Sequence, residues 1–225
     1  MGEISLRRRL EPTLHTDVYE AKLDDEFLMS SAFTVAEIAL ADVALSDIPG
    51  ADLDVMVGGL GLGYTARAVL DDPRVRSLTV VEALEEVIGW HRRGLLPLSQ
   101  GLTSDERCTV VHGDFFAMVA SGPSFGPGSQ EGQDAILVDI DHAPRHHLHP
   151  SHATFYSEWG QRQLAERLTQ GGVYALWSDD PPDQEYISVV ERVFASCEAH
   201  IITFPNPLTG GEAANTVYVA NMGSE

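Results

Sequence analysis

The most constraining feature of the sequence is an apolar run that leads directly into a glycine-rich turn. Residues 53–57 read Leu-Asp-Val-Met-Val, and residues 58–63 contain four glycines in six positions. Glycines between a strand and a helix let a ligand approach the backbone closely, with the helix N-terminus facing it. The third glycine of a dinucleotide fingerprint would stand at Tyr64, so the turn suits a nucleoside better than a pyrophosphate. A tight turn without any ligand is the plainer alternative.

After residue 50, apolar strand patterns alternate with helical patterns. Such alternation predicts βαβ units and a mostly parallel sheet with helices on both faces. The last two strands have no helix between them, which predicts an antiparallel pair at the sheet edge. We therefore expect an α/β, Rossmann-like fold of the class I methyltransferase type, with a mostly parallel seven-stranded sheet and a terminal antiparallel strand. The expected strands are 53–57, 77–81, 108–111, 135–138, 173–177, 200–204 and 215–220.

The N-terminal part has a different pattern. Residues 1–24 alternate loosely, which predicts a short strand segment or hairpin. Residues 25–225 would then form one Rossmann-like domain that binds a nucleoside and carries the catalytic groups. From Glu26 to Ala44, apolar residues recur at roughly helical spacing until Pro49 and Gly50 stop the run. This segment is predicted to be a helix that leads into the core.

Charge excludes several classes of partner. The chain has 14 Lys and Arg against 34 Asp and Glu, a formal net charge of −20. Such a surface repels nucleic-acid phosphates and anionic membranes, and the one basic cluster, residues 7–9, is short. No apolar stretch is long enough for a membrane span, and no signal-peptide pattern is visible. We expect a cytoplasmic protein that binds neither nucleic acid nor membrane.

Two acidic side chains follow neighbouring strands of the expected sheet. Glu82 closes the second strand, where a carboxylate can accept hydrogen bonds from ribose hydroxyls. Asp114 follows the third strand and could accept a hydrogen bond from the exocyclic amine of adenine, although Asp is also a favoured helix N-cap. Together with Gly59, Gly61 and Gly63, these residues predict a nucleoside site at the carboxyl ends of the strands.

A second acidic group follows the central and fifth strands. Asp139 ends the very apolar strand of the DAILVDIDHAP segment, and Asp141 comes two residues later. Two acids so close should raise the pKa of one of them, which suits a general base. A capping or loop-bracing aspartate is the alternative. Asp179 ends the fifth strand and would face the same crevice, so the mouth is acidic and favours an amine or a sulfonium ligand.

Residues 142–152 are rich in histidine. Five histidines stand in this segment, but Pro144 and Pro150 make it a loop, and no fixed helical pair or Cys partner organises a metal site. We expect no metal. Because loops after a catalytic strand often control access, the segment is interpreted as a lid over the crevice.

The residues resemble the spermidine synthase family of aminopropyltransferases, within the class I methyltransferase superfamily. The resemblance runs from about Asp25 to Val219 and includes an aromatic pair at Phe155 and Tyr156. It implies that the chain binds S-adenosylmethionine or its decarboxylated form as a co-substrate, acts on a small amine or polyamine, and forms a homodimer. Its clearest stretches are DDEFLMSSAFTVAEIALADVAL, GGLGLGYTARAVLDDPRVRSLTVVEALEEVI, VHGDFFAMV and DAILVDIDHAP.

The resemblance also assigns roles, residue by residue. The glycine turn would wrap the nucleoside, Glu82 would hold ribose, Asp114 would recognise adenine, and Asp139 matches the catalytic aspartate. Leu62 replaces an Asp that anchors the amine of the aminopropyl tail in the family. Residues 28–31 read Leu-Met-Ser-Ser where the family has a Tyr-His-Glu group for the polyamine, and DIDHAP places Asp141 one residue early. The nucleoside half is kept and the polyamine half is rebuilt.

Three functions remain open from the sequence. The leading hypothesis is a transferase that moves an aminopropyl-type alkyl group to an amine, with Asp139 as general base. Asp141, Tyr156 and Asp179 would then shape the acceptor pocket. A methyltransferase, or an enzyme that cyclises the methionine-derived tail, could use the same nucleoside site. A non-catalytic protein that binds nucleosides or polyamines is the third possibility.

Overall fold

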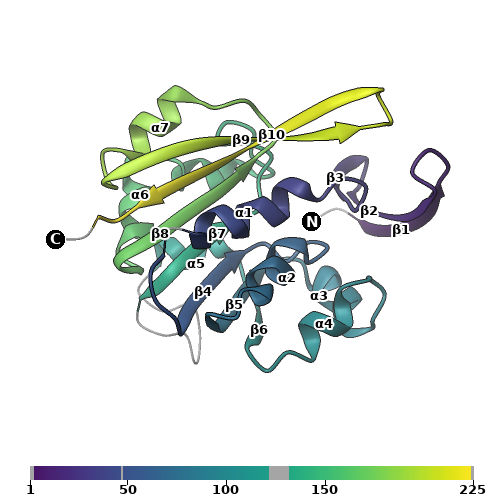
Figure 1. Cartoon of the computed structure of the whole chain (residues 1–225), viewed down its shortest axis with the longest axis horizontal. Coiled ribbons are helices and arrows are strands. Elements are labelled where there is room, and N and C mark those ends of the chain that lie inside the picture. Colours follow the sequence, from purple (N-terminus) through teal and green to yellow (C-terminus); the bar gives the residue numbers. More distant parts are fainter. Residues whose placement is uncertain (1–2, 47, 122–131, 224–225) are drawn as a thin grey trace.

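Two β-sheets organise the part of the chain that the computed structural model describes, residues 3–46, 48–121 and 132–223 (Figure 1). The smaller sheet is antiparallel and N-terminal. The larger sheet has seven strands in the order β6-β5-β4-β7-β8-β10-β9. The strands of the small sheet are β1 (Ile4–Glu11), β2 (Thr16–Leu23) and β3 (Glu26–Ser30). Those of the large sheet are β4 (Leu53–Gly58), β5 (Val75–Glu82), β6 (Cys108–His112), β7 (Gln133–Val138), β8 (Leu168–Ser178), β9 (Ser196–Asn206) and β10 (Gly211–Asn221).

The strand directions confirm the predicted fold class. β4 pairs in parallel with β5 and β7, and the parallel pairing continues to β6 on one side and β8 on the other. β10 inserts between β8 and β9 and is antiparallel to both. The chain therefore leaves β4 toward β5 and β6, then crosses back to place β7 on the other side of β4. Ligands of open α/β sheets bind at the carboxyl ends of the strands beside such a crossover point.

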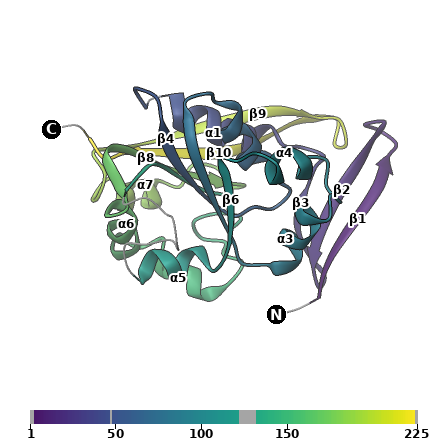
Figure 2. The same ribbon diagram turned by 90° about the horizontal axis from the view of Figure 1, so that it is seen from below.

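Helices cover both faces of the large sheet, and Figure 2 shows α1 and α5 on opposite sides of it. On β4, Val55 and Val57 pack into the hydrophobic cluster that includes α1, α2 and α3, whereas Met56 packs into the cluster of α5, α6 and α7. Successive side chains of β4 point to opposite faces of the sheet, and both faces are buried, which accounts for the apolar residues 55–57 in a row. In the described ranges, no helix is long and apolar enough to cross a membrane. The helices are α1 (Val35–Ser46), α2 (Tyr64–Asp71), α3 (Glu85–Arg92), α4 (Ser99–Thr103), α5 (Phe115–Ala120), α6 (Glu158–Ala165), α7 (Gln184–Val190) and the 3₁₀ turn η1 (Pro150–Thr154).

The segment that starts at Glu26 differs from the predicted helix. Residues 26–30 form β3, and α1 begins only at Val35. β3 pairs with the free edge of β2, in a register that places Met29 opposite Ala21. Over only a few positions, the spacing of apolar residues cannot distinguish the period of a helix from the alternation of a strand. The hydrogen bonds that β2 offers therefore decide the conformation. The N-terminal sheet therefore extends to Ser30, beyond the boundary that we predicted.

Candidate active site

The five predicted strand-end features meet at one edge of the large sheet. The glycine turn follows β4, Glu82 ends β5, Asp114 follows β6, Asp139 follows β7 and Asp179 follows β8. These five strands are parallel, so their carboxyl ends lie at the same edge. The topology thus gathers residues that are far apart in the sequence around the crossover point between β4 and β7.

The backbone conformation of the turn requires glycine at two positions. Gly59 has φ 96° and Gly63 has φ 94°, in the left-handed region that favours glycine. A Cβ atom on Gly59 would lie 2.1 Å from the backbone oxygen of Asp139. The turn therefore lies directly against the residue that follows β7. This contact places Asp139 beside the turn.

Glu82 holds the glycine turn through its carboxylate. Its Oε2 accepts hydrogen bonds from the backbone N–H groups of Leu60 at 2.9 Å and Gly61 at 3.3 Å, and its Oε1 accepts one from Leu84 at 2.9 Å. The residue is 7% exposed. A carboxylate has about four acceptor positions, so one remains for a ligand. The ribose contact that we predicted for Glu82 stays a prediction, and the structure adds a role in shaping the turn.

The first of two cavities, here called the Glu82 cavity, lies between the ends of β4, β5 and β6. Its volume is about 390 Å³, within the usual range for small-molecule sites. Both Glu82 and Asp114 line it. Asp114 also caps α5, because its Oδ1 accepts a hydrogen bond from the backbone N–H of Ala117 at 3.0 Å. The two interpretations of Asp114 are compatible, since its Oδ2 is left for a ligand.

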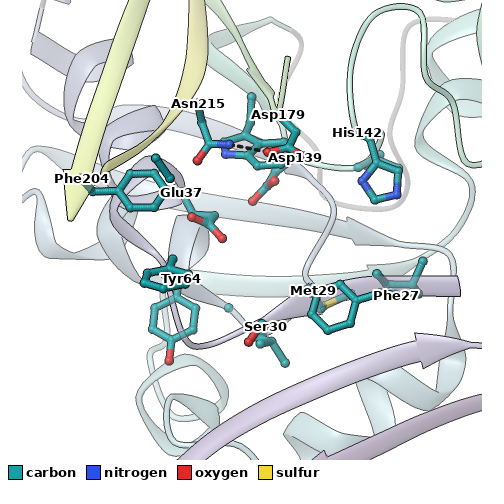
Figure 3. Close-up of a pocket in the computed structure, with 18 of the residues that line it drawn as sticks. Phe27, Met29, Ser30, Glu37, Tyr64, Asp139, His142, Asp179, Phe204 and Asn215 are labelled. Atoms are coloured by element: carbon teal, nitrogen blue, oxygen red, sulfur yellow. Dashed lines mark hydrogen bonds between the residues drawn. The ribbon is translucent and has the colours of Figure 1, made fainter. Parts of the chain in front are cut away.

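The second cavity, here called the Glu37 cavity, has a volume of about 370 Å³. Figure 3 shows Glu37, Asp139 and Asp179 reaching it from three different elements, with Tyr64 and Phe204 among its aromatic walls. Met29, Gly61 and Asp139 line both cavities. Asp139 therefore stands where the two cavities meet, in a position to face ligands in both.

Burial raises the pKa of both inner carboxyl groups, and the charges of neighbouring acids add to this effect for Glu37. Burial raises the pKa of Asp139 to about 6, and a hydrogen bond from Thr65 Oγ1 to its Oδ2 at 2.6 Å opposes part of this rise. Burial raises the pKa of Glu37 to about 8, with further contributions from the negative charges of Asp139 and Asp179. Near neutral pH, Asp139 is therefore ionised while Glu37 keeps its proton. Two carboxyl groups whose pKa values are separated in this way suit proton transfer.

Replacing Glu37 with Gln is expected to stabilise the protein at alkaline pH and not at acidic pH. The pKa of Glu37 rises from 4.5 to about 8 on folding, so the wild type loses stability as pH increases through this interval, whereas Gln has no charge to bury. We expect the melting temperature of the variant to exceed that of the wild type by several degrees at pH 9, since each kcal/mol corresponds to about 2–4 °C. Calorimetry at pH 5 and pH 9 measures this difference.

Asp42→Asn is the matched control, because Asp42 is an exposed carboxylate on the same helix. The difference in melting temperature between this variant and the wild type should be the same at pH 5 and at pH 9. A Glu37→Gln variant that behaves like Asp42→Asn would contradict the buried environment assigned to Glu37.

Asp179 lies at the outer side of the Glu37 cavity. Its Oδ1 accepts a hydrogen bond from Asn215 Nδ2 at 2.8 Å, drawn as a dashed line in Figure 3. Its backbone N–H donates to the carbonyl oxygen of His142 at 2.7 Å. β10 supplies Asn215, so the hairpin of β9 and β10 orients this carboxylate. The structure places Asp179 beside Asp139 and Glu37, in agreement with an acidic mouth.

Asp141 and Tyr156 lie away from both cavities, which corrects their predicted position. Asp141 is 1% exposed, and its carboxylate accepts hydrogen bonds from the Leu148 N–H and His152 Nδ1 at 2.8 Å and from the Tyr156 hydroxyl at 3.0 Å. The two side chains therefore hold the loop from beneath and are absent from the wall of the Glu37 cavity. Asp141 turns away from the cavities because its three donors lie in the segment that follows it.

The histidine-rich segment is held by the same hydrogen bonds. The His147 ring stacks on Tyr156 with centroids 4.8 Å apart, and the His149 side chain caps η1. In the part of the chain that the structure describes, no three His, Cys, Asp or Glu side chains are grouped so as to hold a metal ion. The segment covers the Glu82 cavity with Leu148 and His152, and its action as a moving lid stays a prediction.

Glu37 and Thr65 were not predicted from the sequence. Glu37 stands in the first turn of α1, where an acidic residue is ordinary. Thr65 follows the glycine turn and gives no sign of its partner 74 residues away. The one available signal was that Glu37 is an acid in a mostly apolar segment. Both residues reach the site because α1 packs against α2, and no local sequence pattern reveals that contact.

Comparisons with known proteins point to one family. A sequence model of the spermine/spermidine synthase domain matches residues 34–211. Polyamine aminopropyltransferase 2 of Pseudomonas aeruginosa is 28% identical over 166 residues, which cover 69% of this chain and 44% of that protein. The polyamine aminopropyltransferase of Bacillus mycoides is 27% identical over 228 residues, which cover 89% of this chain and 76% of that protein. The chain thus spans less than half the length of the first relative and about three quarters of the second.

A solved structure supports the same fold. The spermidine synthase from Thermotoga maritima aligns with 98% of this chain and 70% of its own, with a TM-score of 0.72 and 19% sequence identity. At this identity the likeness concerns the fold. It includes the N-terminal sheet, which lies outside the residues matched by the sequence model.

Proposed function

Because the chain belongs to the spermine/spermidine synthase family, we propose that it transfers an aminopropyl-type group from decarboxylated S-adenosylmethionine to a small amine. The Glu82 cavity would take the adenosine part of the donor. The Glu37 cavity would take the donor's tail and the acceptor amine. Asp139, which lines both, would stand next to the reacting atoms.

The observation that carries this proposal is the charge of the Glu37 cavity. Glu37, Asp139 and Asp179 line it, and the described residues around it include no Lys or Arg. A cavity of this sign attracts cations and disfavours a carboxylate. It therefore favours a donor tail that carries only an amine over the intact methionine tail, and it favours an amine as acceptor.

The reaction needs an orienting site and a base. The acceptor nitrogen forms a bond to the tail carbon next to sulfur, the carbon–sulfur bond breaks with its electrons going to the sulfonium, and methylthioadenosine leaves. Asp139 accepts the proton that the nitrogen loses, since its pKa of about 6 leaves it ionised at neutral pH. The Thr65 hydroxyl fixes the carboxylate, and the two adjoining cavities hold the reactants for direct displacement.

Methyl transfer, or cyclisation of the tail, on the same nucleoside site is the second candidate. It is favoured by Leu62, which lines the Glu37 cavity and is 6% exposed. In the family that the sequence resembles, an Asp at this position anchors the tail amine. An apolar side chain there removes one anchor for an aminopropyl tail.

The product nucleoside distinguishes these candidates. Incubation of the purified protein with decarboxylated S-adenosylmethionine and a panel of small diamines is expected to yield methylthioadenosine and an aminopropylated amine, measured by mass spectrometry. Intact S-adenosylmethionine should give far less product, because its carboxylate would enter the acidic cavity.

Other outcomes of this assay would replace the proposal. S-adenosylhomocysteine and a methylated product from the intact donor would establish methyl transfer. Methylthioadenosine formed without an acceptor would indicate cyclisation of the tail. Tight nucleoside binding with no product from either donor would make the chain a binding protein.

A further inference from the structure

His152 occupies a position in the Glu82 cavity that the proposed reaction does not use. It lies in η1, lines the cavity, and its side chain is 13% exposed. Its Nδ1 bonds to Oδ1 of Asp141 at 2.8 Å, and the Asp141 side chain is fully buried. Because a carboxylate is an acceptor, Nδ1 must carry the proton of the ring. In the neutral imidazole, Nε2 is then an acceptor.

The ring is held in one orientation. Its centroid is 4.2 Å from that of Phe116, and Asp141 is itself fixed by the Leu148 N–H and the Tyr156 hydroxyl. Nε2 makes no hydrogen bond to any described residue. The hydrogen bond to the buried Asp141 carboxylate thus fixes the tautomer of His152, and the ring presents Nε2 to the cavity.

Asp114 presents a second acceptor to this cavity. Its Oδ1 caps α5, and its Oδ2 makes no hydrogen bond within the described part of the chain. Phe116, two residues after Asp114, is the ring that contacts His152. The exocyclic amine of adenine carries two N–H donors, and the cavity wall offers two acceptors whose side chains are each held by a hydrogen bond.

We propose that His152 Nε2 accepts one N–H of the adenine amine while Asp114 accepts the other, which makes His152 a specificity-determining residue for the donor nucleoside. This inference rests on the proposed function, since it requires an adenine nucleoside in the Glu82 cavity. Asp141 is then a positioning residue that acts through His152. A site built with fixed partners for a polar group discriminates strongly against a ligand that lacks the group.

The test measures binding and does not need turnover. Calorimetry compares methylthioadenosine with its analogue that has hydrogen in place of the amine, on the wild type and on His152→Asn. The Asn amide can keep a donor toward Asp141, and it removes the nitrogen at the Nε2 position. We expect His152→Asn to bind methylthioadenosine about three- to tenfold more weakly, the value of one hydrogen bond, and to bind the analogue as the wild type does.

Tyr156→Phe is the control, because it removes one hydrogen bond to Asp141 and leaves His152 Nε2 in place. It should keep the wild-type preference for the amine. Equal weakening of both ligands by His152→Asn would show that the ring only shapes the cavity, and would overturn this assignment alone. If the wild type bound methylthioadenosine no better than uridine, the proposed function would fail, and this assignment with it.

Discussion

Replacement of Asp139 with Asn is expected to lower turnover by about 10²–10⁴-fold, the usual contribution of general acid–base catalysis. The amide has the size of the carboxylate and can still accept the hydrogen bond from Thr65, so the geometry should persist. It cannot take the proton of the attacking amine. Glu82 and Asp114 are untouched, and the affinity for methylthioadenosine should therefore change no more than a few-fold. Steady-state kinetics and calorimetry on the same preparations measure the two quantities.

Asp179→Asn provides the matched control, since it removes the same charge from the same cavity. Asp179 is bound by Asn215 and not by Thr65, and it lies farther out in the mouth. We expect this variant to raise KM for the amine with a smaller effect on kcat. In the wild type, activity should decrease as pH falls through about 6, because Asp139 is then protonated. Unchanged turnover in Asp139→Asn would remove this carboxylate from the mechanism.

The residues found from the sequence share a physical property: each stands at or just after the carboxyl end of a parallel strand. Glu82, Asp114, Asp139 and Asp179 are polar groups at the ends of apolar runs, and a parallel sheet brings such ends together whatever the length of the connections. The pattern of the strands therefore predicted which residues meet. It carried no information on which oxygen faces a ligand and which faces a backbone N–H, and the hydrogen bonds of Glu82 to the glycine turn were not foreseen.

The residues that were missed or misplaced depend on contacts between elements. Asp139 and Asp141 look alike in the sequence, yet the first faces the cavities and the second is buried among three donors of the following loop. Glu37 enters the site because α1 packs beside α2 and the sheet. β3 is a strand because β2 has a free edge. Sequence patterns report local periodicity and burial, and none of these outcomes is local.

Replacement of Gly59 with Ala is expected to destabilise the protein by more than about 3 kcal/mol, the sum of an unfavourable φ and a clash with the backbone. Gly59 has φ 96°, and an added Cβ would lie 2.1 Å from the Asp139 oxygen and 3.1 Å from Ile140 Cγ1. Relief would require β4 and β7 to separate at the ends that form the site. For a chain of this size the melting temperature should fall by at least roughly 6–12 °C.

Gly50→Ala separates the two causes of this effect. Gly50 has φ 94°, nearly the same as Gly59, and a Cβ there would have no neighbour within 4 Å. Its substitution should cost only the conformational term, on the order of 1–3 kcal/mol. The excess in Gly59→Ala then measures how tightly the glycine turn is pressed against Asp139. Equal losses in the two variants would mean that the turn can move away from β7 without cost, and that the placement of Asp139 at the junction of the two cavities does not depend on it.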